Sequence, residues 1–347
     1  MHKKNLTICF FGRYDPNYSR NRILKRGLEQ NGVKIIECRT ELKRVVKYFD
    51  LIKKHWKIRK EYDVLLVAFP GWHAMILSKF LTRKPIIFDI FLSVYDSTVF
   101  DRKNTEPNSI KARYFWFLDW LACKLADKVL LDTNEHIKYF VQEFGIEKEK
   151  FARVLVGTDE RVFSPIENLK NNGKFTIHFH GTNISLQGIK YILESAKLLE
   201  KYPDIQFNII GTNIKREYQN NEYKNINFTD NVPYKKLPMQ IAQTDVCLGI
   251  FGDTDKVQRV IPNKVYECIA CHKPVITADT SAIRELFDES DLMLIPTANS
   301  QELVKAILKL KKDVELREKL VENAYNKFIK NCTPKIITLK LLKEINV

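Results

Sequence analysis

Short apolar runs alternate with amphipathic stretches along almost the whole chain. In the first half the runs are LTICFF, VKIIEC, DVLLVAF, PIIFDIF and KVLLDT, and each is followed by apolar residues at helical spacing. That spacing predicts helices over about 20–31, 42–60, 110–126 and 134–144, and one through Met75 and Phe80. Such alternation is typical of a parallel sheet with helices on both faces.

The second half repeats the plan. Strands are expected at FTIHFHG, DIQFNIIG, INFTD, DVCLGIFG, PVITAD and LMLIP. Helices are expected at 189–202, 237–243, 265–271 and 282–288, with a polar loop after DIQFNIIG. Gly157, Pro165, Asn171, Asn172 and Gly173 mark a linker near 164–174. We therefore expect an α/β protein of two doubly wound domains, residues 1–165 and 166–330, and a last segment 331–347 with a helix at about 334–345.

Composition favours a globular, reduced protein. With 347 residues, 45% hydrophobic and 29% charged, the chain can form two cores of ordinary size. Its seven cysteines are odd in number and lie in apolar surroundings, which fits reduced thiols in the cytoplasm. The start MHKKNLTICFFGRY is interpreted as a first strand and not as a signal peptide, and no apolar run approaches the roughly 20 residues of a membrane span.

The positive charge is concentrated in the first half. The chain has a formal charge of +15, and residues 1–165 carry 31 Lys and Arg against 20 Asp and Glu, a net +11. The segment 42–60 sets an apolar stripe among eight basic residues; the stripe is Leu42, Val45, Val46, Phe49, Ile52 and Trp56. The helix could pack this stripe on its own domain and solvate the basic face, or it could lie on an anionic bilayer. We expect no nucleic-acid partner, because no zinc-finger, helix-turn-helix or aromatic RNA-binding pattern is found.

Two motifs suggest metals or haem but have simpler explanations. Cys268, Cys271 and His272 have the Cys-x-x-Cys-His spacing of a c-type haem site, yet no secretory segment or second ligand pair accompanies them. Buried cysteines on a helix that ends before Pro274 are the better explanation. Asp253 and Asp255 form an Asp-x-Asp, which can hold a hard cation but also suits a solvated loop.

Four segments in order resemble family 4 retaining glycosyltransferases of the two-Rossmann GT-B fold. They are KVLLDTNEHIKYFVQEFGIEKEKFARVLVGTDERVFSP, FHGTNISLQGIKYILESAKLL, INFTDNVPYKKLPMQIAQTDVCLGIF and RVIPNKVYECIACHKPVITADTSAIRELF. The resemblance implies a cleft between two domains, an acceptor-binding domain 1–165, a nucleotide-sugar donor domain 166–330, and a last helix that returns to the first domain. It also implies transfer without a metal or other cofactor.

The family pattern places the donor site in the second domain. It assigns Gly181, Thr182 and Asn183 to a glycine loop, and Asn263 and Glu267 to the signature helix, with Glu267 as the second Glu of Glu-x7-Glu on the donor ribose. This chain departs from the family where Arg259 replaces the first Glu, and where Thr182 and Gln187 replace an Arg and a Lys that clamp the diphosphate. We therefore expect Arg259 and Lys264 to form a relocated clamp; they could also be ordinary surface cations.

In the first domain several groups follow the predicted strands. Gly12, Arg13, Arg20, Arg22 and Asp96 are expected on the acceptor side. Asp89 and His73 are the candidates for positioning the sugar, and with Arg259 they form the expected catalytic set; buried hydrogen-bonding roles are the alternative. The family often has a His two residues after Asp89, but Phe91 stands there, so no catalytic base is named.

These observations predict a hexosyl-type glycosyltransferase that acts on a lipid-linked or polysaccharide acceptor in cell-envelope glycan synthesis. It would be cytoplasmic and peripheral on an anionic membrane through helix 42–60. A nonhydrolysing nucleotide-sugar epimerase and a catalytically silent GT-B protein that binds lipid or a partner are the alternatives. The sequence leaves open the nucleotide, the sugar, the linkage and the oligomeric state.

Overall fold

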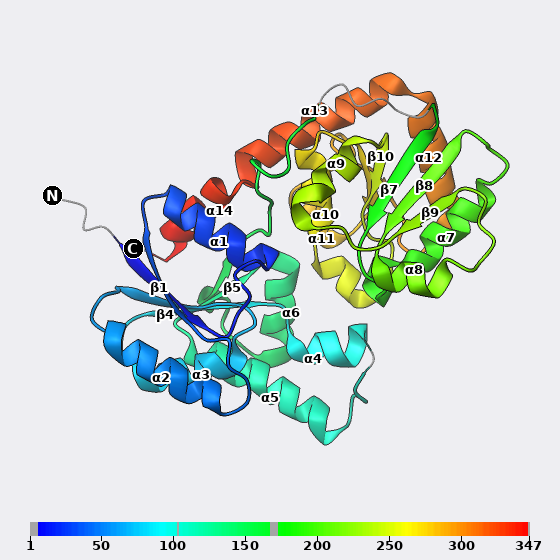
Figure 1. The fold of residues 1–347 in the computed structure, drawn as a ribbon. Coiled ribbons are helices and arrows are strands. Elements are labelled where there is room, and N and C mark those ends of the chain that lie inside the picture. The colour runs from blue at the N-terminus through cyan, green and yellow to red at the C-terminus, as the bar shows by residue number, and fades with distance from the viewer. Residues whose placement is uncertain (1–5, 103, 167–172, 346–347) are drawn as a thin grey trace. The chain divides into compact units, whose positions relative to one another are not determined.

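The computed structural model describes residues 6–102, 104–166 and 173–345 (Figure 1). The chain forms two compact units: unit 1 takes Met1–Val156 and Thr333–Val347, and unit 2 takes Gly157–Cys332. The first division follows Val156 in the structure, whereas the sequence analysis expected it near residue 165. Of the linker expected near 164–174, residues 167–172 lie outside the described part.

The sheet of unit 1 has six parallel strands in the order β2-β1-β3-β4-β5-β6. The strands are β1 (Thr7–Gly12), β2 (Lys34–Arg39), β3 (Val64–Val67), β4 (Ile86–Phe91), β5 (Lys128–Leu131) and β6 (Phe151–Arg153). All residues of β1 and β3 are buried, which explains why these strands are continuous apolar runs. The short edge strand β6 was not expected from the sequence.

Helices connect these strands. They are α1 (Ser19–Gln30), α2 (Val46–Ile58), α3 (Trp72–Leu81), α4 (Val94–Asp96), η1 (Ser97–Asp101), α5 (Ile110–Leu125), α6 (Asn134–Phe144), η2 (Lys148–Lys150) and, from the end of the chain, α14 (Pro334–Glu344). The ends of α6 agree with the prediction, since the Thr133 side chain accepts from the His136 amide and Gly145 ends the helix with φ 59°.

The sheet of unit 2 also has six parallel strands, in the order β12-β11-β10-β7-β8-β9. The strands are β7 (Phe175–His180), β8 (Ile205–Ile210), β9 (Ile226–Thr229), β10 (Val246–Leu248), β11 (Val275–Ala278) and β12 (Met293–Ile295). After β9 the chain returns to the other side of β7, so the strand order reverses between β7 and β10. This is the order of a doubly wound Rossmann sheet.

The helices of unit 2 are η3 (Ser185–Gln187), α7 (Ile189–Leu198), α8 (Thr212–Tyr218), η4 (Tyr234–Lys236), α9 (Leu237–Ala242), η5 (Asp255–Arg259), α10 (Asn263–Ala270), α11 (Ser281–Arg284), α12 (Ser300–Lys312) and α13 (Val314–Asn331). Two details correct the sequence interpretation. The polar segment after β8 forms α8 and not a loop. Helix α10 begins at Asn263, before the expected start at residue 265, so Glu267 lies one turn inside it.

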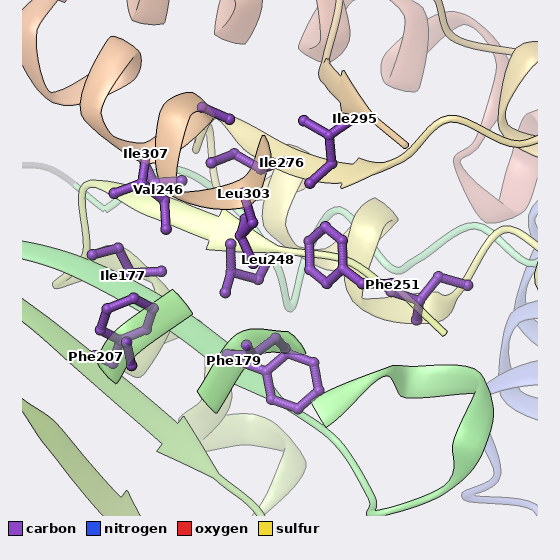
Figure 2. Close-up of a cluster of buried hydrophobic side chains, with 14 of the residues drawn as sticks. Ile177, Phe179, Phe207, Val246, Leu248, Phe251, Ile276, Ile295, Leu303 and Ile307 are labelled. Atoms are coloured by element: carbon purple, nitrogen blue, oxygen red, sulfur yellow. The ribbon is translucent and has the colours of Figure 1, made fainter. Parts of the chain in front are cut away.

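The core of unit 2 lies between its sheet and the helices. Figure 2 shows Phe179 and Phe207 from β7 and β8 beside Leu248 of β10, with Leu303 and Ile307 of α12 above the sheet. These side chains are all buried, and such a cluster is the main source of stability for a unit of this size. Unit 1 has its own core around Phe11, Phe88 and Phe140.

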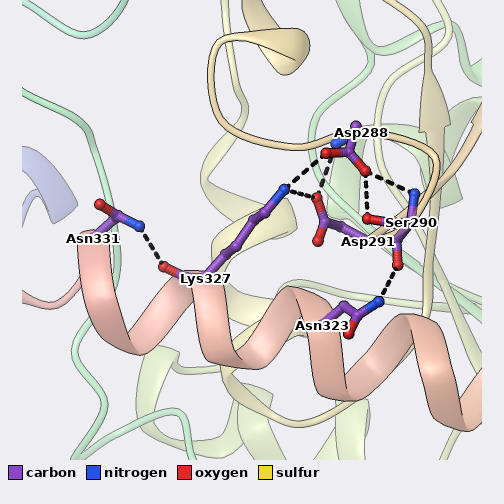
Figure 3. A network of polar contacts seen from close by, with 6 residues as sticks. All are labelled: Asp288, Ser290, Asp291, Asn323, Lys327 and Asn331. Carbon is purple, nitrogen blue, oxygen red and sulfur yellow. Dashed lines mark hydrogen bonds and ion pairs between the residues drawn. The ribbon is translucent and has the colours of Figure 1, made fainter.

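A polar network fastens α13 to the loop after α11 (Figure 3). Lys327 lies 2.9 Å from a carboxylate oxygen of Asp288 and 2.5 Å from one of Asp291, whose side chain is buried. Asn323 donates to the Ser290 carbonyl at 2.7 Å. The hydrogen bonds of Ser290 and then the ion pair with Lys327 lower the pKa of Asp288 to about 2.

The last helix, α14, packs on α1 within unit 1 (Figure 1). Asn31 donates to the Lys335 carbonyl at 2.8 Å and to the Thr338 hydroxyl at 2.9 Å. A Cβ at Gly27 would collide with the Pro334 carbonyl, so glycine lets the two helices approach closely.

Helix α2 packs through a face other than the predicted apolar stripe. Its buried residues are Leu51 and His55, and His55 pairs with the Tyr62 hydroxyl at 2.7 Å. The stripe itself is exposed, with Phe49 at 68% and Trp56 at 67%. Of the two alternatives that the sequence left open, packing of the stripe on its own domain is therefore excluded. Among the helices that the structure describes, none is long and apolar enough to cross a membrane.

Candidate functional site

The candidate site of unit 2 lies where strand β7 ends. In open doubly wound sheets, ligands bind outside the carboxyl ends of the strands at the point where the strand order reverses. In this sheet that point lies between β7 and β10, and the turn at Gly181 directly follows β7. The predicted glycine loop is thus located at the edge where open doubly wound sheets bind their ligands.

Two glycines of this loop lie in tight surroundings, and one of them also has a left-handed backbone. A Cβ at Gly181 would lie 3.0 Å from the Lys264 amine, 3.2 Å from the Gln187 side-chain oxygen and 3.3 Å from the Phe179 ring. Gly188 has φ 66°, and its Cβ would lie 2.5 Å from the Phe251 carbonyl carbon. Any side chain at Gly181 would therefore compete for the space around Lys264.

Lys264 is a buried cation that has no carboxylate within ion-pair distance in the described structure. Its amine donates to the Gln187 side chain, lies 3.7 Å from the centre of the Phe179 ring and is buried beside Gly181. Burial lowers the pKa of Lys264 to about 7, although Cys268 and Glu267 oppose the shift. An anion that bound beside Gly181 would find a cation with no competing ion pair.

One turn further along α10, Glu267 is held by a pair of histidines. Its Oε2 lies 2.9 Å from His180 Nε2, and His180 Nδ1 lies 2.8 Å from His178 Nε2. His178 is buried, and burial lowers its pKa well below the ordinary value, with His180 and Lys264 adding to the shift. Sequence reasoning missed both histidines, although the pattern His-x-His in β7 places them on one face of the strand.

The remaining donor-side residues lie nearer the surface. Asn183 donates to Glu217 of α8 at 2.5 Å, and Thr182 is exposed. Asn263 is the first residue of α10, and Arg259, the last residue of η5, is partly exposed. The structure brings Gly181, Lys264 and Glu267 together at the end of β7.

The two metal-like motifs have other partners. Asp253 accepts from Lys190 at 2.9 Å and from the Tyr191 hydroxyl at 3.0 Å. Cys268 and Cys271 are buried free thiols, as expected, and His272 pairs with Glu322 at 3.0 Å. Within the described ranges, no three His, Cys, Asp or Glu side chains form a cluster that could hold a metal.

In unit 1 the structure pairs two of the predicted site residues with each other. The Arg20 guanidinium contacts both oxygens of Asp89 at 2.9 to 3.1 Å and donates to the carbonyls of Val154 and Leu155. Both side chains are almost wholly buried, at 1% and 0% exposure. Burial raises the pKa of Asp89, and Arg20 opposes that rise. This arrangement fits the alternative that the sequence left open, a buried hydrogen-bonding role.

The other acceptor-side candidates have separate partners or none that joins them directly to one another in the described structure. Gly12 ends β1 with φ 133°, and Arg13 is exposed beside it. Arg22 donates to the Asn17 carbonyl at 2.6 Å, and Asp96 is buried at the end of α4. His73 lies at the surface 2.7 Å from the Tyr114 hydroxyl; partial desolvation and Lys47 lower its pKa.

Asp119 of α5 organises the segment after β4, which the sequence did not indicate. It accepts from Trp72 and Ser93 at 2.6 Å and from the amides of Val94 and Tyr95. Burial raises the pKa of Asp119 to about 7 against these hydrogen bonds. The position of Asp96 therefore depends on a carboxylate from another helix.

A pocket of about 540 Å³ lies elsewhere in unit 2, between α7 and residues 218–223. It is lined by Lys190, Leu193, Glu194 and Lys197 on one side and by Tyr218 and Tyr223 on the other. None of the residues proposed for the donor site lines it, so it is not part of that site.

Comparison with known proteins places both sheets in one known architecture. Residues 161–327 match the family model of the glycosyl transferases group 1. Sucrose-phosphate synthase from Thermosynechococcus elongatus is similar over 98% of each chain, with 14% identity and a TM-score of 0.74. This chain has the GT-B fold. Two further structures are similar over almost the whole chain.

Anabaena HepE in complex with UDP-glucose superimposes with a TM-score of 0.72 and 15% identity, over 98% of this chain and 99% of that one. A glycosyltransferase from Rickettsia africae gives 0.69 and 16%, over 98% and 97%. No curated protein sequence matches the chain significantly. The GT-B assignment therefore rests on the fold of the whole chain, while the family match covers 161–327, which is most of unit 2.

Proposed function

We propose that this protein is a glycosyltransferase that moves a sugar from a nucleoside diphosphate sugar to an acceptor, with the donor bound by unit 2. The observation that carries the proposal is the pair on α10. Lys264 and Glu267 present a buried cation and a carboxylate at the carboxyl end of β7, inside the segment that matches the glycosyl transferases group 1. The complexes of HepE with UDP and UDP-glucose support a uridine nucleotide as the first candidate.

The chemistry requires a cation where the diphosphate leaves. Transfer breaks the bond between the anomeric carbon and the diphosphate oxygen, forms a bond from that carbon to the acceptor oxygen, and moves the acceptor proton to the leaving phosphate. Negative charge grows on the diphosphate, and a fixed cation stabilises it most in a site that excludes water. Lys264 fills that role, and Arg259 is the second member of the proposed clamp.

Glu267 is proposed to accept hydrogen bonds from the ribose hydroxyls, with Gly181, Thr182, Asn183 and Asn263 around the rest of the nucleotide. The resemblance to retaining family 4 enzymes favours transfer with retention and without a metal. Gly12, Arg13, Arg22, Asp96 and His73 remain candidates for the acceptor in unit 1. The buried pair of Arg20 and Asp89 is left out of this set because each already satisfies the other.

A nucleotide titration tests the donor site. Thermal unfolding is followed with UDP, GDP, ADP, CMP and TDP, since a ligand that binds only the folded state stabilises it by about 2.7 kcal/mol at a hundredfold excess over Kd. We expect one nucleotide to raise the unfolding temperature, and R259A and K264A to reduce the shift. K190A, which removes an exposed cation paired with Asp253, is the matched control.

Product analysis then separates the possible enzymes. Incubation of the donor alone should leave the sugar unchanged, whereas an epimerase would convert it. Lipid-linked and polysaccharide acceptors should yield a product with retained anomeric configuration. Nucleotide binding without turnover on any acceptor would instead indicate a silent GT-B protein.

We also propose that helix α2 attaches unit 1 to an anionic membrane, which would suit a lipid-linked acceptor in cell-envelope glycan synthesis on the cytoplasmic face. The exposed stripe, Leu42, Val45, Val46, Phe49, Ile52 and Trp56, begins just before α2 and continues along it, beside exposed Lys53, Lys54 and Lys57. The Arg59 guanidinium lies 3.3 Å from the centre of the Trp56 ring. Apolar side chains beside cations are typical of helices that lie in an anionic interface.

Vesicle sedimentation tests this surface. The protein should sediment with vesicles that contain phosphatidylglycerol and remain free with pure phosphatidylcholine. The double variant F49S/W56S should lose binding, while L198S, at an exposed apolar position of unit 2, should keep it. Equal binding by F49S/W56S and the original protein would exclude α2 as the membrane contact.

A further inference from the structure

The two histidines of β7 have one arrangement of hydrogen atoms that satisfies Glu267. A carboxylate only accepts hydrogen bonds, so His180 Nε2 carries the hydrogen that points to Glu267 Oε2 at 2.9 Å. A neutral His180 then accepts at Nδ1, and His178 donates to it from Nε2 at 2.8 Å. The chain of donors therefore runs from His178 through His180 to Glu267.

The second ring nitrogen of His178 argues against the alternative in which a charged His180 donates to His178. His178 Nδ1 is buried and has no hydrogen-bond partner among the described residues. A charged His180 would donate from both nitrogens and would move the hydrogen of His178 onto Nδ1, where a buried N–H would lack an acceptor. An unprotonated Nδ1 avoids that cost, and burial lowers the pKa of His178 in the same sense.

Glu267 is thereby fixed through one oxygen only. The structure shows a partner for Oε2 and none for Oε1 within its described ranges, and Glu267 is 6% exposed. A carboxylate with one anchored oxygen has the other available for a ligand hydroxyl.

We propose that His178 and His180 are positioning residues that fix the Glu267 carboxylate so that Oε1 accepts hydrogen bonds from the ribose hydroxyls of the nucleotide donor. The proposal rests on the proposed function for the ribose, and on geometry alone for the hydrogen-bond chain. His180 acts through Glu267 and needs no contact with the nucleotide. His178 acts through His180 by fixing which nitrogen of that ring carries the hydrogen.

A thermodynamic cycle tests the positioning role by combining a substitution at His180 with removal of the ribose hydroxyls from the nucleotide. Affinities for UDP and 2′,3′-dideoxy-UDP are measured by calorimetry for the original protein, H180L and H180Q. The original protein should bind the dideoxy nucleotide about tenfold more weakly, and H180L should bind UDP about tenfold more weakly but lose little further with dideoxy-UDP. H180Q should recover most of the affinity for UDP, because its amide nitrogen can donate to Glu267.

The controls separate positioning from folding. Thermal unfolding identifies any variant that loses structure, and E322A, which removes the exposed partner of His272, should leave both affinities unchanged. If H180L weakens both nucleotides equally, the histidines have no role through Glu267, and the inference fails while the proposed function stands. If the original protein binds neither nucleotide, the proposed function fails, and the ribose part of the inference with it.

The hydrogen-bond chain has its own test without any nucleotide. Nitrogen-15 NMR of the imidazoles at pH 7 should show His178 and His180 neutral, each with its hydrogen on Nε2. A doubly protonated His180, or a hydrogen on Nδ1 of His178, would overturn the chain.

Discussion

The two units treat charge differently at the carboxyl ends of their strands. In unit 1, Asp89 near the end of β4 forms an ion pair with Arg20, and Nη1 of Arg20 donates to two backbone carbonyls. In unit 2, the Lys264 cation has an amide as its partner and Glu267 has a histidine, although they lie one turn apart on α10. In the first arrangement each charge is paired within the fold. In the second, the cation and the carboxylate have neutral partners, and the proposed donor would supply the charge that Lys264 lacks.

The comparison shows why buried charge by itself does not identify a site. Two buried charges lose their hydration, and their mutual attraction returns part of that free energy. Lys264 shows that cost in a pKa lowered to about 7. A buried charge without an opposite charge beside it is unfavourable in the folded protein. Such a group is a better candidate for function than a charge that is already paired.

The largest effect is expected when the closed pair is broken. D89A should destabilise unit 1 by about 3–5 kcal/mol, because it leaves the Arg20 charge buried without a carboxylate. All four tryptophans belong to unit 1, so tryptophan fluorescence during urea unfolding reports this unit alone. R20M/D89L should recover much of the loss. E41A, which removes an exposed partner of Arg39, should change stability by less than about 0.5 kcal/mol.

The open site should respond in the opposite direction. K264M should stabilise unit 2 near pH 7 by about 1–3 kcal/mol, because it removes a buried cation that lacks a carboxylate partner. It should also weaken binding of UDP by at least about tenfold. Calorimetry of unfolding and of binding measures the two changes. A K264M variant that loses stability and keeps UDP affinity would show that Lys264 is a structural cation.

Binding of UDP should depend on pH through Lys264. The folded apo protein has this pKa lowered to about 7, and a bound diphosphate would raise it, so binding takes up a proton when the pH is above about 7. Affinity should therefore fall by up to about tenfold per unit as the pH rises above 7. K264M should lose this slope. Calorimetry in buffers of different ionisation enthalpy counts the proton directly.

The smallest effect is expected at the network of α13 (Figure 3). K327M should cost about 1 kcal/mol, because Asp291 keeps the Asp288 amide as a donor. The lowered pKa of Asp288 means that its stabilisation is complete above its unfolded pKa of about 4 and is lost as the pH falls towards 2. Acid unfolding of unit 2, followed by circular dichroism, should show a smaller loss over this range in K327M.

Local hydrophobic patterns predicted the helices and strands whose formation depends mainly on burial. The apolar runs of β1, β3 and β7 became buried strands because both faces of a parallel sheet are covered. The order of helices and strands and the four family-like segments predicted the GT-B fold. The segment after β8 was mistaken for a loop because its polar residues give little apolar periodicity, although it forms α8.

Side-chain partners across the sequence were less predictable. The stripe of α2 has the spacing of a packed face, yet the helix is buried through Leu51 and His55. That choice depends on what the neighbouring elements offer, such as the Tyr62 hydroxyl for His55. The His-x-His of β7 was visible in the sequence, but alternation alone could not show that Glu267 would accept from it.

The sequence by itself determined the α/β class, the two doubly wound units and the place of the glycine loop, since these follow from hydrophobic periodicity and from residues adjacent in the chain. Tertiary structure decided which charges are neutralised. Arg20 meets Asp89 across 69 positions, and His180 meets Glu267 across 87. A buried charge without a partner is costly in free energy, whereas a paired one has little left to offer a ligand. Whether a charge serves the fold or a binding site therefore depends on the partner that folding brings to it.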